Sequence, residues 1–248
     1  EMNQMLNWLQ FWENDFEQDK SEPTYFTLWE NFIIRNILKD ILPDKNVKMQ
    51  MLSNINSDRF FMNLFKGIEK DPKYKAKYWT QYNGRKIDGW PELITRALEN
   101  TIEYMRFYNK TNPTEWGEFH PFIYPSVPMT KTSLKDIFDR SVNAGGSWNT
   151  ISIGVFKHWK YETDKFACIV SGNLKFIVEM GENIYYSIDT GQSENVLSKH
   201  YFDMNERNMK SDLYSVLNKT ELTKLTQKNP DIRLIGINSQ KFESKDDL

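Results

Sequence analysis

Apolar side chains recur every three or four residues through much of the first hundred positions, and this period predicts amphipathic helices. One apolar stripe consists of Met5, Trp8, Leu9, Trp12 and Phe16. After a break at Ser21-Glu22-Pro23, a second stripe consists of Phe26, Trp29, Phe32, Ile33 and Ile37. Pro43 is expected to end this second helix, because proline cannot continue the hydrogen-bond ladder.

Two further helices are predicted before residue 110. Ser57 is placed to cap a short helix that carries Phe60, Phe61, Leu64 and Phe65. Glycines, Pro72 and charges over residues 67–89 predict a long irregular connection or an insertion. Pro91 then suits the first turn of a helix. The buried side of that helix is predicted to be Leu93, Ile94, Ala97, Leu98, Thr101, Ile102 and Met105.

The pattern changes near residue 110, where prolines exclude another long helix and a period of two follows. Ile151, Ile153 and Val155 alternate with small residues, which predicts a strand. Ser171-Gly172-Asn173 predicts a hairpin turn between strands at 166–170 and 174–180. A second turn, at 181–183, leads to a strand at 184–188. A helix over about 203–217 and a strand over 232–237 complete the prediction.

These elements together predict an α+β fold. A mainly helical region covers residues 1–110, and antiparallel strands with a C-terminal helix cover residues 111–248. Because a meander of three strands is only marginally stable unless its apolar face is covered, we expect the helices to pack on the sheet. The two regions are therefore expected to form one structural unit.

Charge, cysteine content and hydropathy argue against a nucleic-acid partner, an intrachain disulfide and a membrane-spanning helix. The 32 basic and 34 acidic residues leave a net charge of -2, so no extended basic face for nucleic acid is expected. Cys168 is the only cysteine, which excludes an intrachain disulfide, and its apolar neighbours predict a buried thiol. No apolar run reaches the ~18 residues that a membrane-spanning helix needs, and no targeting segment indicates a compartment.

Metal and cofactor sites are not predicted either. His120, His158 and His200 are widely separated and lack the short spacing of metal-ligand pairs. Gly145-Gly146 precedes a predicted strand without the Lys-Ser or Lys-Thr of a phosphate loop. We therefore expect neither a metal nor a cofactor.

Five short motifs follow one another along the chain. They are residues 7–12, Trp116-Gly117-x-x-His120, Gly146-Ser147-Trp148-Asn149-Thr150, residues 176–180, and Gly191-Gln192-Ser193 with Ser198-Lys199-His200-Tyr201. In this order they resemble the C-terminal part of the penicillin acylase (penicillin amidase) family. The chain departs from the family pattern at Glu13-Asn14 and Ser147-Trp148, which each replace Asp-Gly, and at Lys199, which replaces proline.

The resemblance implies an N-terminal nucleophile hydrolase, whose fold is a four-layer αββα sandwich. In this family a precursor cuts itself and exposes a serine as the first residue of the large chain, and its α-amino group is the general base. An amine with a pKa near ~8 can accept the hydroxyl proton at neutral pH. Glu1 cannot replace that serine, and Ser53-Asn54 lacks the processing context. The family's oxyanion asparagine also belongs upstream, so no catalytic residue is expected in this chain.

Glu179 has two interpretations. In the predicted strand it shares a face with Lys175 and Ile177, which fits a surface carboxylate or a partner of Lys175. In some family members, a carboxylate at the matching position orients the residue beside the nucleophile. Both interpretations stay open at this point.

The other motif residues are expected to be structural. A buried imidazole at His120 or His200 would bond backbone groups on two sides and fix a turn. Gly146 and Gly191 would supply backbone conformations that a β-carbon forbids, and Gln192 would bind neighbouring backbone. The full structural set is Trp116, Gly117, His120, Gly146, Asn149, Thr150, Gly191, Gln192, Ser193, His200 and Tyr201.

The function that the resemblance implies belongs to a longer protein. This chain would be the C-terminal portion of an autoprocessing precursor, and its first partner would be the missing small chain and nucleophile-bearing segment. The complete enzyme would hydrolyse a linear acyl amide such as a penicillin or an acyl-homoserine lactone, and the chain alone would be inactive. The alternatives are a non-catalytic partner chain and an aromatic-rich ligand-binding module. Because a cut sheet exposes strand edges, self-association is expected.

Overall fold

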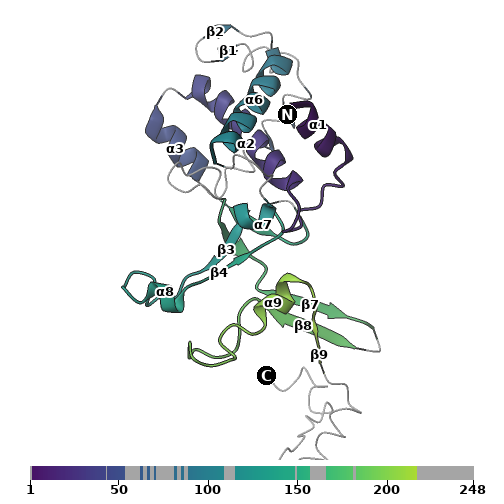
Figure 1. The fold of residues 1–248 in the computed structure, drawn as a ribbon, viewed down its shortest axis with the longest axis vertical. Helices are drawn as coiled ribbons and strands as arrows, with labels where there is room; N and C mark the ends of the chain where they lie inside the picture. Colours follow the sequence, from purple (N-terminus) through teal and green to yellow (C-terminus); the bar gives the residue numbers. More distant parts are fainter. Residues whose placement is uncertain are drawn as a thin grey trace, which may run out of the picture. The chain divides into compact units, whose positions relative to one another are not determined.

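The computed structural model describes residues 2–42, 44–53, 62–63, 66–67, 70, 81–82, 85–86, 89–108, 115–148, 150–156, 166–180 and 183–216. The predictions for Pro43, Ser57, Asn149, His158 and the strand at 232–237 lie outside these residues. The chain divides into two compact units, Glu1–Gly172 and Asn173–Leu248 (Figure 1). The predicted division of the chain near residue 110 stays a prediction.

The helices of the first unit follow the predicted stripes closely. Three of them match a predicted stripe: α1 (Met2–Phe11), α2 (Glu22–Ile41) and α6 (Gly89–Tyr108). A further helix, α3 (Lys45–Ser53), was not predicted. Pro91 lies in the first turn of α6, as predicted, where its missing N–H costs nothing. The indole Nε1 of Trp29 on α2 donates to the backbone oxygen of Ile94 on α6 at 3.1 Å, so the two long helices are joined side by side.

The ends and faces of these helices differ from the prediction in two respects. α2 also buries Leu28, Ile34 and Leu38, because it packs against both α1 and α6. α1 stops at Phe11, so Trp12 and Phe16 follow the helix instead of continuing its stripe. The chain turns at Asn14, whose φ of 61° lies in the left-handed region.

A four-stranded sheet completes the first unit. Its strands are β3 (Pro121–Tyr124), β4 (Arg140–Asn143), β5 (Gly154–Phe156) and β6 (Cys168–Ser171), in the order β4-β3-β6-β5. β3 and β6 run parallel at Phe122 and Cys168, whereas the other pairs are antiparallel. Two short helices, α7 (Trp116–Phe119) and α8 (Lys135–Phe138), flank β3 along the chain, and β1 (Gln81–Tyr82) and β2 (Arg85–Lys86) form a separate small hairpin.

The alternating strand predicted at residues 151–155 is wrong. Ile151 is fully exposed, and the strand β5 covers only Gly154–Phe156, all of whose residues are buried. The reason is local: the Thr150 hydroxyl donates to the backbone oxygen of Ser152 at 2.7 Å, which holds a turn where the strand was expected.

The described residues of the second unit form a three-stranded antiparallel sheet and one short helix (Figure 1). The strands are β7 (Leu174–Val178), β8 (Ile184–Ile188) and β9 (Tyr214–Val216), in the order β7-β8-β9, and the helix is α9 (Asn205–Met209). Val178 pairs with Ile184, which confirms that the strands on either side of residues 181–183 form an antiparallel pair.

Two other predictions in this region are wrong. Ser171-Gly172-Asn173 joins no hairpin, because β6 pairs with β3 and β5 while β7 pairs with β8. The helix predicted over 203–217 ends at Met209, and the chain then turns at Ser211 (φ 56°) into β9. Pairing of β9 with β8 outweighs the helical period of that segment.

The core of the first unit joins its helices to its sheet. It consists of Leu28, Met105, Trp116, Phe119, Phe156 and Phe166. Side chains from α2, α6 and α7 thus share one cluster with Phe156 of β5. This confirms the predicted α+β class. Among the described residues, no helix is both long and apolar enough to cross a membrane.

Candidate functional site

Two of the five motifs meet in the first unit, on the segment that follows α1. Four hydrogen bonds make the junction. The backbone N–H groups of Trp116 and Gly117 donate to the oxygens of Lys20 and Gln18 at 2.6 and 2.7 Å. The N–H of Gly146 donates to Phe16 O at 2.6 Å, and the Trp116 indole donates to Gly146 O at 2.9 Å. Segments distant in the sequence are thereby fixed in one place.

His120 lies at the centre of this junction and is fully buried. Its ring stacks on the Trp116 indole, with centroids 4.5 Å apart, and lies edge-on to Phe156. Its Nδ1 is 2.6 Å from the backbone oxygen of Phe166. Since a carbonyl only accepts, Nδ1 carries the proton and the imidazole is the Nδ1–H tautomer.

The other ring nitrogen of His120, Nε2, is also buried, and burial of the ring determines the pKa of this residue. Nε2 has no hydrogen-bond partner among the described residues, and a β-carbon at Gly154 would lie only 2.7 Å from it. Burial lowers the pKa of His120 from 6.5 to about 4, although the bond to Phe166 opposes the shift. Burial therefore favours the neutral form of the His120 imidazole at physiological pH.

The loop after Gly145 is closed by its own motif residues. Gly146 has φ +85°, and a β-carbon there would approach Ser152 O to 1.9 Å, so only glycine fits. The Thr150 hydroxyl accepts from the N–H of Ser147 at 2.8 Å while donating to Ser152 O. This confirms the expectation that Gly146 supplies a conformation that a β-carbon forbids.

In the second unit, the Gly-Gln-Ser and His-Tyr parts of the fifth motif lie against each other. The N–H of Ser193 donates to His200 O at 3.0 Å, and a β-carbon at Gly191 would reach the same oxygen at 2.0 Å. Gln192 is exposed, and its amide has no hydrogen bond within the part of the chain that the structure describes. Tyr201 is half-buried beside this loop.

His200 differs from His120 in its surroundings. Its side chain is 57% exposed, and its Nδ1 lies 2.7 Å from the Asp203 carboxylate. The buried-imidazole interpretation thus fits His120 alone. Ser193 and Ser198 are close in sequence, but their hydroxyls accept from the backbone N–H groups of Asn195 and His200, which holds the loop.

Glu179 is an exposed carboxylate just beyond the end of β7. It accepts a hydrogen bond from the Tyr185 hydroxyl at 3.2 Å and lies 3.5 Å from the Asn183 amide. Lys175 is directed elsewhere, since its ammonium donates to Asn208 O at 2.6 Å and to the Ser211 hydroxyl at 3.1 Å. Of the two interpretations, the surface carboxylate fits these contacts, without Lys175 as partner; the orienting role stays a prediction.

Sequence reasoning missed a buried amide pair on α9. The Asn205 side chain donates to Asp189 O at 2.7 Å, and that of Asn208 donates to Ser187 O at 3.2 Å. Both asparagines are almost completely buried, and they tie α9 to β8. Their spacing of three residues on a short polar helix was the available signal.

The arrangement holds backbone in place but contains little reactive chemistry. Burial raises the pKa of the Cys168 thiol to about 12, so it is inert at neutral pH. In the described ranges, no three His, Cys, Asp or Glu residues are grouped to hold a metal ion. The junction around His120 and the loop formed by the fifth motif fix turns and join secondary-structure elements.

The α+β fold and the five ordered motifs are consistent with the class of N-terminal nucleophile hydrolases. Consistently, the family model described as penicillin amidase matches residues 1–223, a span that includes all five motifs. The chain therefore belongs to the penicillin amidase family of amidohydrolases. The curated proteins contain no match to it.

Proposed function

We propose that this chain is the structural C-terminal portion of an acyl-amide hydrolase whose nucleophile is a serine outside these residues. The observation that carries the proposal is the family match over residues 1–223 together with the roles of the matched motifs. Those motifs supply turns and a junction, and the most buried histidine is held neutral. Ser193 and Ser198, the described serines of the fifth motif, use their hydroxyls to hold their own loop.

The reaction follows from the family's mechanism. The serine oxygen of the large chain attacks the carbonyl carbon of a linear acyl amide, and its proton passes to the chain's own α-amino group. The amine leaves with that proton, and water then releases the acid from the acyl-serine. Residues 1–248 contribute the scaffold that holds the nucleophile-bearing part in its active geometry.

The partner in this proposal is the remaining part of the precursor, its small chain and nucleophile-bearing segment. The second unit supports it. β7 is an edge strand, and its apolar side chains Phe176, Ile177 and Val178 are 56%, 54% and 46% exposed. An edge of this kind pairs readily with another strand. When the remaining part is absent, a second copy of the chain takes its place.

The test is a reconstitution. The purified chain is assayed with an acyl p-nitroanilide, alone and after co-expression with the nucleophile-bearing part. We expect no turnover alone, turnover after co-expression, and its loss when the first serine of the other part is replaced by alanine. Turnover by the chain alone would overturn the proposal.

A further inference from the structure

A pocket of about 440 Å³ lies in the first unit, between the end of α1 and the start of α2. Its size falls in the range of small-molecule sites, roughly 300–1,000 Å³. Three aromatic rings and three carboxylates line it: Trp8, Phe11, Trp12, Glu13, Asp19 and Glu22. None of these residues belongs to the junction around His120.

Two of the three rings are held in place before any ligand binds. The Trp12 indole donates to the Asp15 carboxylate at 2.9 Å and to Asp15 O at 2.8 Å, and it packs on Phe26. Trp8 packs on Tyr25, with centroids 5.6 Å apart. Fixed rings reduce the entropy that binding would otherwise cost.

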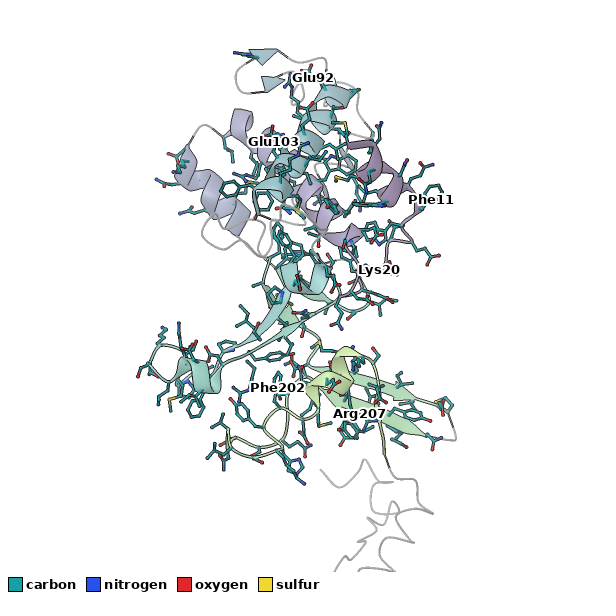
Figure 2. The ribbon with its side chains drawn as sticks, in the orientation of Figure 1. Phe11, Lys20, Glu92, Glu103, Phe202 and Arg207 are labelled. Carbon is teal, nitrogen blue, oxygen red and sulfur yellow. The ribbon has the colours of Figure 1, made fainter. Side chains whose placement is uncertain are left out.

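The third ring, Phe11, is unusual in its exposure. It is 80% exposed at the last residue of α1, although it borders the pocket. Figure 2 shows Phe11 and Lys20 on the side of the first unit where α1 ends. An aromatic ring left this open at a pocket rim is available to cover a ligand.

The charge of the lining selects the kind of ligand. Glu13, Asp19 and Glu22 have no ion pair or hydrogen-bonded side-chain partner in the described part of the chain. The one cation in the lining, Lys20, is bound to Asp15, which lies outside the lining, and also interacts electrostatically with Glu13. The lining thus combines three carboxylates and one ammonium, a net negative charge, with aromatic faces, and both features attract cations.

We propose that this pocket binds a small organic cation, a primary or quaternary ammonium with an apolar body. The ammonium lies among the three carboxylates, and the apolar body lies between the rings of Trp8, Phe11 and Trp12. The site lies wholly within residues 8–22, and the proposal does not rest on the hydrolase function.

Calorimetric titration of the purified protein tests the proposal with three probes of similar size. They are benzyltrimethylammonium, neutral benzyl alcohol and anionic benzenesulfonate. We expect benzyltrimethylammonium to bind with a Kd on the order of 1 mM, at least tenfold more tightly than the other two. Equal binding of benzyl alcohol, or no binding of the cation, would overturn the proposal.

Variants locate the site. Phe11→Ala is expected to weaken binding about threefold, and combined Glu13→Gln, Asp19→Asn and Glu22→Gln about tenfold or more. Phe11 is so exposed that its replacement leaves folding intact, which circular dichroism verifies. Phe107→Ala removes a phenylalanine that is 76% exposed on α6 and should leave the Kd unchanged. An equal effect of Phe107→Ala and Phe11→Ala would place binding elsewhere and overturn the assignment.

Discussion

The imidazole of His120 lies flat on the indole of Trp116, with the ring planes 14° apart and the centroids 4.5 Å apart. The two residues are the ends of one motif, four positions apart across α7. The indole is bonded to Gly146 O and the imidazole to Phe166 O. One stacked pair therefore connects the helical part of the first unit to its sheet.

The free energy of unfolding should depend on pH because of His120. The folded state holds the pKa of His120 near 4, whereas the unfolded chain has the ordinary value of 6.5. Between pH 4 and pH 6.5 the unfolded state binds a proton on His120 that the folded state does not bind. The free energy of unfolding therefore falls as pH falls through this range. The loss should approach about 3 kcal/mol between pH 6.5 and pH 4, with a slope of at most ~1.4 kcal/mol per pH unit. Urea unfolding at several pH values measures it.

The control for this prediction is His120→Asn, whose side-chain amide can still donate to Phe166 O but does not titrate. We expect the variant to be less stable at pH 7 by roughly 1–3 kcal/mol, with a shallower slope between pH 5 and 6.5. If the dependence of the free energy of unfolding on pH were the same in the variant, protonation of His120 would not be its cause.

Gly146→Ala should destabilise the first unit strongly. The left-handed φ and the 1.9 Å approach to Ser152 O both oppose a β-carbon, so we expect a loss of at least ~2 kcal/mol in urea unfolding. Gly172 is the matched control, because a β-carbon there meets nothing within 4 Å. Gly172→Ala should change stability by less than about 1 kcal/mol, and similar losses in the two variants would contradict this reading of the loop.

Particular residues show what could be predicted from the sequence. α2 and α6 were foreseen because each has an apolar stripe that local periodicity reveals. The hairpin predicted at Ser171-Gly172-Asn173 is wrong, because turn residues do not determine which strands pair, and strand pairing is non-local. The same limit applies to β9, where pairing with β8 overrides a helical pattern.

Among the site residues, too, some roles could be predicted from the sequence and others could not. Gly146 was identified from its motif as a backbone requirement, and the φ of +85° confirms it. Asn14 occupies the place of the glycine in the family's Asp-Gly, and its φ of 61° gives the physical reason for glycine there. The spacing of Asn205 and Asn208 places them on one face of a helix, but their burial depends on how α9 packs on β8.

The exposed strand β7 should make the isolated chain self-associate. Ile177→Lys places a charge on the apolar edge, and we expect it to raise the dissociation constant at least tenfold in sedimentation velocity. Val127→Lys, at a position that is 86% exposed in the first unit, is the control and should have no effect. A chain that stays monomeric at high concentration would contradict the proposed edge.

Glu179→Gln separates the two interpretations of this carboxylate. As a surface residue bonded to Tyr185, it should change the free energy of unfolding by less than about 0.5 kcal/mol and leave kcat of the reconstituted enzyme unchanged. We expect this result from its exposure. A tenfold or larger fall in kcat at unchanged KM and stability would instead identify Glu179 as a positioning residue.

Covalent labelling of the natural enzyme tests the central claim most directly. The protein from its source is inactivated with phenylmethylsulfonyl fluoride, and peptide mass spectrometry identifies the modified residue. The proposal predicts the label on a serine that is the first residue of a mature chain and lies outside residues 1–248. Inactivation with the label on a serine within these residues would contradict it.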